Sequence, residues 1–238
     1  MTVEISIVVP SIRTENLNKV YDSICQSTKR EFELIVAGPY ALPERLQTLK
    51  NVKYVKELGS PVRASQIAST LCEGKLFTHI ADDGMLLPNA LDESIDLLYK
   101  MGEDKKNVVV AKYFEGVNGT NKPLQPDNYF KLNGSDWTSS PYIGDWWLFN
   151  VCVMYTEFFD ELGGWDCSYE GTFYAHADLA VRAQFYGANV KMCDIPFADC
   201  DHEQTDHAPI EYAQVGHDKP LFLGKYRDPS WVMQQMCI

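Results

Sequence analysis

The chain has 238 residues, of which 45% are hydrophobic and 23% are charged. This composition is typical of one large globular domain and excludes a disordered chain, a collagen and a coiled coil. The formal net charge of -12 repels the phosphates of nucleic acids and of anionic lipids, so we expect neither as a partner.

The apolar stretches and the cysteines exclude other classes of protein. Stretches such as Ile5–Pro10 and Trp146–Tyr155 are too short to span a bilayer, and the N-terminus lacks the basic region and cleavage site of a signal peptide. The seven cysteines are widely spaced and form no CxxC pair, which disfavours a zinc or redox centre. We expect a cytoplasmic protein with no transmembrane segment.

The first half of the chain predicts alternating strands and helices. Ile5–Val9 is a β-branched run of the kind that forms a strand buried on both faces, and a helix that Thr14 can cap follows it. The remaining predicted strands are Phe32–Ala37, Val52–Val55 and Leu76–Ala81. The remaining predicted helices are Pro43–Leu49, Val62–Cys72 and Asn89–Met101, the last capped by Asn89. The pattern predicts a parallel sheet.

The second half of the chain is less regular. A strand at Val108–Ala111 is followed by a stretch rich in Gly, Asn and Pro, residues 116–141, which predicts an irregular insert. Later strands are expected at Trp147–Tyr155 and Val190–Cys193. Helices are expected at Glu157–Leu162 and from His176 to Gly187, and a polar tail is expected beyond Pro196.

Two adjacent acids, Asp82 and Asp83, follow the fourth predicted strand. Such a pair often only caps and solvates a turn. At the carboxyl edge of an open α/β sheet, however, one carboxylate can bind a divalent cation while the other holds a ribose hydroxyl. His202, or His207, could complete a manganese site because manganese accepts imidazole beside carboxylate. Otherwise both histidines belong to a polar tail.

Asp178 lies in the first turn of a predicted helix, where the helix dipole stabilises a carboxylate. That placement explains the acid structurally, and it also keeps Asp178 ionised and able to accept a proton from a bound hydroxyl. Asp166 and Glu170 compete for this role. Trp147 and its aromatic neighbours could stack on a sugar ring or could pack in the core.

Taken in order, these features resemble a GT-A fold glycosyltransferase, most closely the family 2 type, over roughly the first two hundred residues. Residues 5–11 resemble the opening VVP segment of the family, and residues 81–84 its DXD region. Arg63 resembles the arginine between the third strand and the metal-binding strand. Residues 163–166 and 178–182 resemble the segment GG-[FW]-D/E followed by ED-x-DL-x-x-R.

The resemblance implies a single GT-A (Rossmann-like) α/β domain with a mostly parallel central sheet flanked by helices. Residues 1–110 would form the donor-binding half, residues 111–200 the acceptor-binding and catalytic half, and residues 201–238 a tail that closes over the site. Residues expected to bind the nucleotide-sugar donor are Pro10, Ser11, Arg13, Arg63 and Asp82. Residues expected to hold Mn2+ or Mg2+ are Asp83 and His202. Residues expected to bind the acceptor are Gly164, Trp165, Asp166 and Trp147.

The chain departs from the family at three places. Gly84 stands where the last acid of the DXD region would be, which makes Asp83 the expected metal ligand. No acid follows the second strand, where residues 37–39 read Ala-Gly-Pro, and the ED pair is replaced by Ala175-His176. We therefore expect Asp178 to be the catalytic base, with His176 and Asp166 as alternates.

The expected activity is metal-dependent transfer of a sugar from a nucleoside-diphosphate sugar, a UDP-sugar, to an acceptor hydroxyl of a glycan or other molecule, with inversion. Two alternatives stay open. One is a sugar nucleotidyltransferase, although such enzymes open with a Gly-rich loop that the chain lacks after its first strand. The other is a non-catalytic, glycan-binding descendant of a glycosyltransferase, which the missing ED pair suggests.

Overall fold

The structure, a computed structural model, describes residues 3–116, 122–123, 131–132, 146–201 and 213–226. The first half of the chain alternates strands with helices, as the sequence predicts. Its strands are β1 (Ile5–Pro10), β2 (Phe32–Gly38), β3 (Val52–Lys56), β4 (Leu76–His79) and β5 (Gly84–Leu86). Its helices are the 3-10 turn η1 (Thr14–Asn16), α1 (Leu17–Ser27), α2 (Glu44–Gln47), α3 (Pro61–Ser69) and α4 (Ala90–Lys100).

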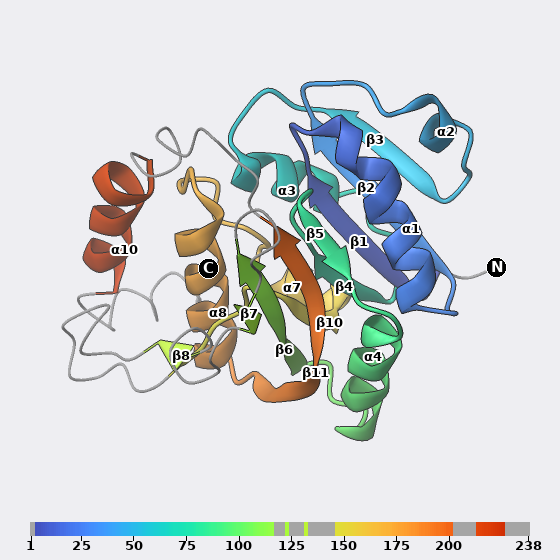
Figure 1. Ribbon diagram of the computed structural model, residues 1–238. Coiled ribbons are helices and arrows are strands. Elements are labelled where there is room, and N and C mark those ends of the chain that lie inside the picture. The colour runs from blue at the N-terminus through green and yellow to red at the C-terminus, as the bar shows by residue number, and fades with distance from the viewer. Residues whose placement is uncertain (1–2, 117–121, 124–130, 133–145, 202–212, 227–238) are drawn as a thin grey trace.

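Within the residues that the structure describes, the second half adds short strands, two long ones and four helical segments. The strands are β6 (Asn107–Gly116), β7 (Lys122–Pro123), β8 (Lys131–Leu132), β9 (Trp146–Trp147), β10 (Cys152–Tyr155) and β11 (Asn189–Asp201). The helices are α7 (Thr156–Glu161), α8 (Thr172–Phe185), the π-helical turn η2 (Ala213–Asp218) and α10 (Lys219–Lys225). In Figure 1, α10 lies beside α8, on the side of the molecule away from α1.

Both halves of the chain share one nine-stranded sheet, in the order β3-β2-β1-β4-β10-β6-β11-β5, with β7 paired to β6. Strands β1 to β4, β6 and β11 point in one direction, while β5, β7 and β10 run opposite to them. Helices α3 and α4 pack on different parts of this sheet, α3 on β1 and β2 and α4 on β6 and β11. This confirms the predicted single α/β domain with a mostly parallel central sheet.

The core forms where the sequence is most regular. The side chains of β1 from Ile5 to Val9 are fully buried, because neighbouring strands and helices cover both faces of the sheet. In α1, Leu17, Val20 and Ile24 are also fully buried, so the predicted apolar stripe faces the core. Burial of this stripe stabilises α1 on the sheet.

Several local predictions are wrong. Thr14 begins the 3-10 turn η1 rather than capping α1, and neither η1 nor α1 has a side-chain cap. Asn89 precedes α4 in a left-handed conformation with φ 60° and also makes no side-chain cap. The run expected as one strand at Trp147–Tyr155 divides into β9, which pairs with β8, and β10, which joins the main sheet.

The region around Pro196 also differs from expectation. Instead of giving way to a polar tail, β11 continues to Asp201 through Phe197 and Ala198, which are buried. Its outer part pairs with β5, which follows Asp83 directly. The chain therefore returns to the sheet immediately after the paired acids, and this return fixes their place at the carboxyl edge. No helix in the described ranges is both long and apolar enough to cross a membrane.

Candidate active site

Asp82, which follows β4, holds the loop after β1 in place through hydrogen bonds. Its Oδ2 accepts hydrogen bonds from Ser11 Oγ at 2.9 Å and from the backbone N–H groups of Ile12 and Arg13 at 3.0 Å each. Its Oδ1 accepts from Arg13 Nε at 2.9 Å and also contacts Arg13 Nη2. The Asp82 side chain is 3% exposed. Asp82 thus shapes the loop with both oxygens, which leaves it poorly placed to hold a ribose directly.

Asp83 lies beside the same guanidinium. Arg13 Nη2 is 3.1 Å from Asp83 Oδ2, so Arg13 bridges the two acids while its own side chain stays 20% exposed. The structure therefore brings together four of the predicted donor and metal residues, Ser11, Arg13, Asp82 and Asp83, with Pro10 at the end of β1 beside them. A cation at this edge attracts an anionic phosphate, and Arg13 is such a cation.

Arg63 lies on a different element, in the first turn of α3. Its backbone N–H donates to the capping Ser60 Oγ at 3.3 Å, and its Nε is 3.1 Å from Glu57 Oε1. The Arg63 side chain is 60% exposed. The pKa of the Cys167 thiol is raised, first by burial and then by Asp166, while the charge of Arg63 acts in the opposite direction. Arg63 therefore lies near the loop that follows Trp165.

The Gly163-Gly164-Trp165 turn is held from two helices. Both glycines have positive φ, 80° and 68°, and a Cβ on Gly164 would lie 2.3 Å from Gln66 Oε1 of α3. Gln66 Oε1 also accepts from the Trp165 backbone N–H at 2.6 Å. Arg182 of α8 donates to the Gly164 carbonyl at 2.7 Å. Trp165 itself is 3% exposed, so its ring packs in the core and presents no face for a sugar.

Asp178 is fully buried in a charged cluster. Its carboxylate accepts from Arg182 Nε at 2.7 Å and from Tyr226 Oη at 2.6 Å, and it also contacts Lys225 Nζ. Its side chain has 0% exposure. A carboxylate that is enclosed by three donors cannot reach a substrate hydroxyl, and Asp178 instead orients the arginine that holds the Gly163-Gly164 turn. This environment argues against the predicted role as base.

Asp166 sits at the edge of the same cluster. Its Oδ1 accepts from the backbone N–H of Ser168 at 2.9 Å and from Ser168 Oγ at 2.6 Å, and its Oδ2 lies 2.9 Å from Lys225 Nζ. Burial raises the pKa of Asp166, but the hydrogen bonds from Ser168 and Lys225 outweigh burial and lower the pKa to about 2. Asp166 is 32% exposed, so it can bind an acceptor hydroxyl but is a weak base.

His176, the third candidate base, lies in the first turns of α8 against His79, the last residue of β4. The centroids of the two imidazole rings are 4.5 Å apart, and the Trp165 ring is 5.0 Å from His176. Burial, and then the neighbouring His79, hold the pKa of His176 well below its usual 6.5. His176 keeps some exposed surface. A neutral imidazole has a bare ring nitrogen that can accept a proton at pH 7, although the lowered pKa makes His176 a weaker base than a free histidine.

Trp147 does not join this group. Its backbone N–H donates to Gln184 Oε1 at 3.0 Å, and Gln184 Nε2 donates back to the Trp147 carbonyl at 2.8 Å. Gln184 follows His176 by about 12 Å along the helix axis, at 1.5 Å per residue. A sugar on Trp147 would therefore be remote from His176. His202 and His207 lie outside the described residues.

The described residues offer one partial metal site. No group of three His, Cys, Asp or Glu side chains within them is arranged to hold a metal ion. Asp83 supplies a hard oxygen ligand of the kind that Mn2+ and Mg2+ accept, but Arg13 already neutralises it. A divalent ion at Asp83 therefore has to displace Arg13 and take further ligands from elsewhere, for which His202 is the sequence candidate.

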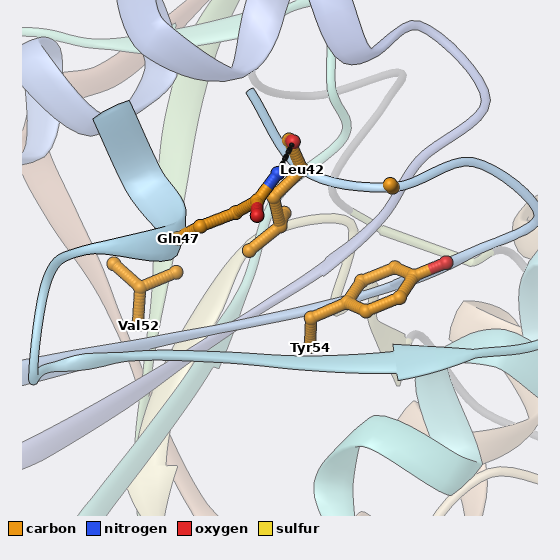
Figure 2. A pocket seen from close by; sticks show the side chains of 5 residues that line it. Leu42, Gln47, Val52 and Tyr54 are labelled. Carbon is orange, nitrogen blue, oxygen red and sulfur yellow. Dashed lines mark hydrogen bonds between the residues drawn. The ribbon is translucent and has the colours of Figure 1, made fainter. Parts of the chain in front are cut away.

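A small pocket of about 270 Å³ lies on the edge strand β3, and one of its lining residues, Tyr54, donates to the Gly38 carbonyl at 3.0 Å. Figure 2 shows that Leu42, Gln47, Val52 and Tyr54 line it, with the Gln47 side chain hydrogen-bonded to the Leu42 carbonyl at 2.6 Å. None of the lining residues is charged.

Comparison with solved structures supports the architecture. Residues 1–349 of S. aureus TarS match with a TM-score of 0.59 and 16% identity, over 94% of this chain and 70% of that one. The same protein in complex with UDP-GlcNAc matches with a TM-score of 0.63 and 15% identity, over 94% and 71%. The chain has the GT-A fold. The complex of TarS with UDP matches with a TM-score of 0.62. Neither a family model nor the sequence of a curated protein matches the chain.

Sequence reasoning missed two functional features of the site. It did not single out His79, because a lone histidine at the end of an apolar strand carries no motif. It also missed the bridging role of Arg13, although the guanidinium follows the first strand by three residues. The adjacent acids Asp82 and Asp83 were the available signal for this role of Arg13, because buried carboxylates require a nearby cation.

Proposed function

We propose that the chain is a glycosyltransferase that moves a sugar from a nucleoside-diphosphate donor, a UDP-sugar, to an acceptor hydroxyl. The observation that carries this proposal is the meeting of Arg13, Asp82 and Asp83 after β4 in a GT-A fold, with His176 packed on His79 at the end of that strand. Ligands of open α/β sheets bind at the carboxyl ends of the strands, which is this edge. Neighbours of the same fold have been solved with UDP and with UDP-GlcNAc.

The anionic leaving group needs a local positive charge, because the chain as a whole carries a net charge of -12. Arg13 and the exposed Arg63 supply it from the two sides of the edge, the loop after β1 and the start of α3. Charge placed where it develops in the transition state stabilises that state more than the ground state. Hydrogen bonds to Asp82 hold the backbone of the loop from Ser11 to Arg13 in place, so this loop forms a fixed surface on one side of the site.

We assign the base to His176 instead of Asp178. Its unprotonated ring nitrogen takes the proton from the acceptor hydroxyl as the oxygen attacks the anomeric carbon. The new carbon–oxygen bond forms, the bond to the phosphate oxygen breaks, and UDP departs with the bonding electron pair. A single displacement of this kind inverts the anomeric carbon. Gly164 and Asp166 would line the acceptor side, because Trp165, which lies between them in the chain, contacts His176.

A divalent ion, Mn2+ or Mg2+, forms a separable part of the proposal. Asp83 and His202 would hold it, and bound there it would neutralise charge on the departing diphosphate. Asp83 fits this role by its chemistry and its place, although it must first separate from Arg13. Asp82 serves the site indirectly in this scheme, through the loop it fixes.

Calorimetric titration of UDP, with and without Mn2+, tests the binding site. Asp83→Asn should weaken UDP binding at least tenfold in the presence of Mn2+. The matched control is Asp194→Asn, which removes the same charge from a side chain on β11 that is fully exposed and should bind like the wild type. Equal UDP affinity in all three proteins would remove Asp83 from the site.

One alternative, a glycan-binding protein without activity, is favoured by the replacement of the ED pair with Ala175-His176. Both readings predict ligand binding, but they differ in turnover. Transfer or hydrolysis of a UDP-sugar that His176→Gln abolishes would support the enzyme. Tight UDP binding with no turnover on any UDP-sugar would support the binding protein.

A further inference from the structure

His79 has one committed ring nitrogen and one buried nitrogen with no assigned partner. Its Nε2 lies 3.1 Å from the Asn150 carbonyl oxygen, and a carbonyl can only accept, so the proton of neutral His79 is on Nε2. The Nδ1 atom is then a bare acceptor. It is buried and has no hydrogen-bond partner within the described residues, in a side chain that is 4% exposed. Buried acceptors of this kind are usually satisfied.

The His176 ring packs against the ring of His79. The two ring centroids are 4.5 Å apart with an interplanar angle of 54°, so the rings are tilted rather than stacked. Trp165 contacts both rings, with its centroid 4.8 Å from His79 at an angle of 87° and 5.0 Å from His176. The Trp165 indole Nε1 also lacks a partner within the described residues, so it is the competing donor for His79.

We propose that His79 is a positioning residue for His176. Nδ1 of His79 accepts the ring N–H of His176, which leaves the other nitrogen of His176 bare and turned toward the acceptor hydroxyl. Hydrogen bonds between catalytic groups are often long in the free enzyme and shorten when the substrate binds. This inference rests on the assignment of His176 as the base in the proposed function.

The scheme accounts for the proton at each step. The acceptor O–H bond breaks and its proton goes to the bare nitrogen of His176, which becomes an imidazolium. The second N–H of that imidazolium remains donated to His79 Nδ1. No electron transfer or further reactant is required, and the proton leaves to water after UDP has departed.

A neutral partner suits this buried place. A carboxylate at the position of His79 would pay a large desolvation cost among Phe77, Phe159 and Trp165. Burial lowers the pKa of His79 to about 4, so this ring is uncharged at pH 7. The arrangement resembles in its logic an aspartate that orients a catalytic histidine, with an imidazole lone pair in place of the carboxylate.

The direct test is nitrogen NMR of the whole chain with 15N-labelled histidine. The proposal expects a single tautomer for His176 and a 15N–15N coupling across the hydrogen bond to His79 in the complex with UDP. Trp165→Phe should leave the His176 tautomer unchanged. A loss of the fixed tautomer in that variant, or a mixed tautomer in the wild type, would overturn the proposal.

Kinetics supply a second, independent readout. His79→Phe keeps an aromatic ring but removes both nitrogens, and it should lower kcat by about 10–100-fold with little change in the KM for the donor, as is usual for lost orienting partners. His79→Gln can accept and donate at similar positions and should recover part of that loss. If His79 is only structural, His79→Phe and His79→Gln should lower the melting temperature equally, and kcat should not fall selectively relative to the KM. If His176→Gln keeps full turnover, the assignment of the base fails, whereas the NMR coupling can still be present.

Discussion

Replacing Asp178 by Asn should destabilise the protein strongly and leave the chemistry intact. The carboxylate contacts Arg182, Lys225 and Tyr226 and has no exposed surface. Asn keeps the size of the side chain but removes its charge, so the buried cations Arg182 and Lys225 lose the carboxylate between them, while the partly exposed Asp166 stays beside Lys225. Removing one partner of a buried ion pair costs about 3–5 kcal/mol.

This free energy converts into a large change in melting temperature. For a domain of this size, each kcal/mol shifts Tm by about 2–4 °C, so Asp178→Asn should melt about 6–20 °C below the wild type. Asp22→Asn is the matched control, because Asp22 and Arg45 form an ion pair in which both side chains are 50% exposed. Solvent screens such a surface pair, so its loss should change Tm little.

The assay combines thermal unfolding, followed by circular dichroism, with the rate of UDP release from a UDP-sugar at a temperature where both variants are folded. We expect the folded Asp178→Asn protein to retain a rate close to that of the wild type. A variant that melts like the wild type but releases no UDP would refute this reasoning. It would restore Asp178 as the base and show that the buried cluster opens during turnover.

Three further predictions concern the neighbouring residues. Burial and a neighbouring imidazole hold the pKa of His176 well below 6.5, so His176 stays unprotonated on mild acidification. We therefore expect kcat to be flat from pH 7.5 to pH 6. A histidine of ordinary pKa would instead lose about three quarters of its unprotonated form at pH 6. The pKa of Asp166 is lowered from 3.8 to about 2, since hydrogen bonds from Ser168 and Lys225 outweigh the opposing effect of burial. Its contribution to folding is therefore complete above about pH 4 and is lost as the pH falls toward 2, so Asp166→Asn should show a flatter dependence of stability on pH in that window. Gly164→Ala should lower the free energy of unfolding in urea by about 1–3 kcal/mol, because Gly164 has φ 68° and the new Cβ would lie 2.3 Å from a side-chain oxygen of α3. An unchanged midpoint of urea unfolding would show that the turn relaxes freely.

The sequence predicts the sheet well where local pattern decides the structure. The apolar run at Ile5–Val9 and the spacing of Leu17, Val20 and Ile24 determine which surfaces are buried, whatever the rest of the chain does. The place of Asp82 and Asp83 also follows from the pattern, because they come directly after a strand of a parallel sheet. These features needed only the order of strands and helices.

Contacts between distant segments could not be predicted in this way. Strand β5 has three residues and exists because it pairs with β11, more than a hundred positions later. Asp178 is enclosed in the fold because Lys225 and Tyr226, which lie 47 and 48 positions later in the chain, contact its carboxylate. A single sequence shows the acid in its helix but not the cations that enclose it.

The same limit applies to the aromatic residues. Trp165 follows a pair of glycines and was a candidate sugar platform, yet it is buried between His79 and Phe159. Composition cannot distinguish a core tryptophan from a binding one, because both lie beside glycine turns and other aromatics.

The most direct test of the central claim is turnover. Purified protein is incubated with a panel of UDP-sugars and Mn2+, and release of UDP is measured for the wild type, His176→Gln and the exposed-site control Asp194→Asn. The account predicts UDP release from at least one donor by the wild type and by Asp194→Asn, and a loss of about 100-fold or more in His176→Gln, the size expected for a positioned base. Equal rates in the wild type and His176→Gln, or no release from any donor by a wild-type protein that binds UDP, would contradict it.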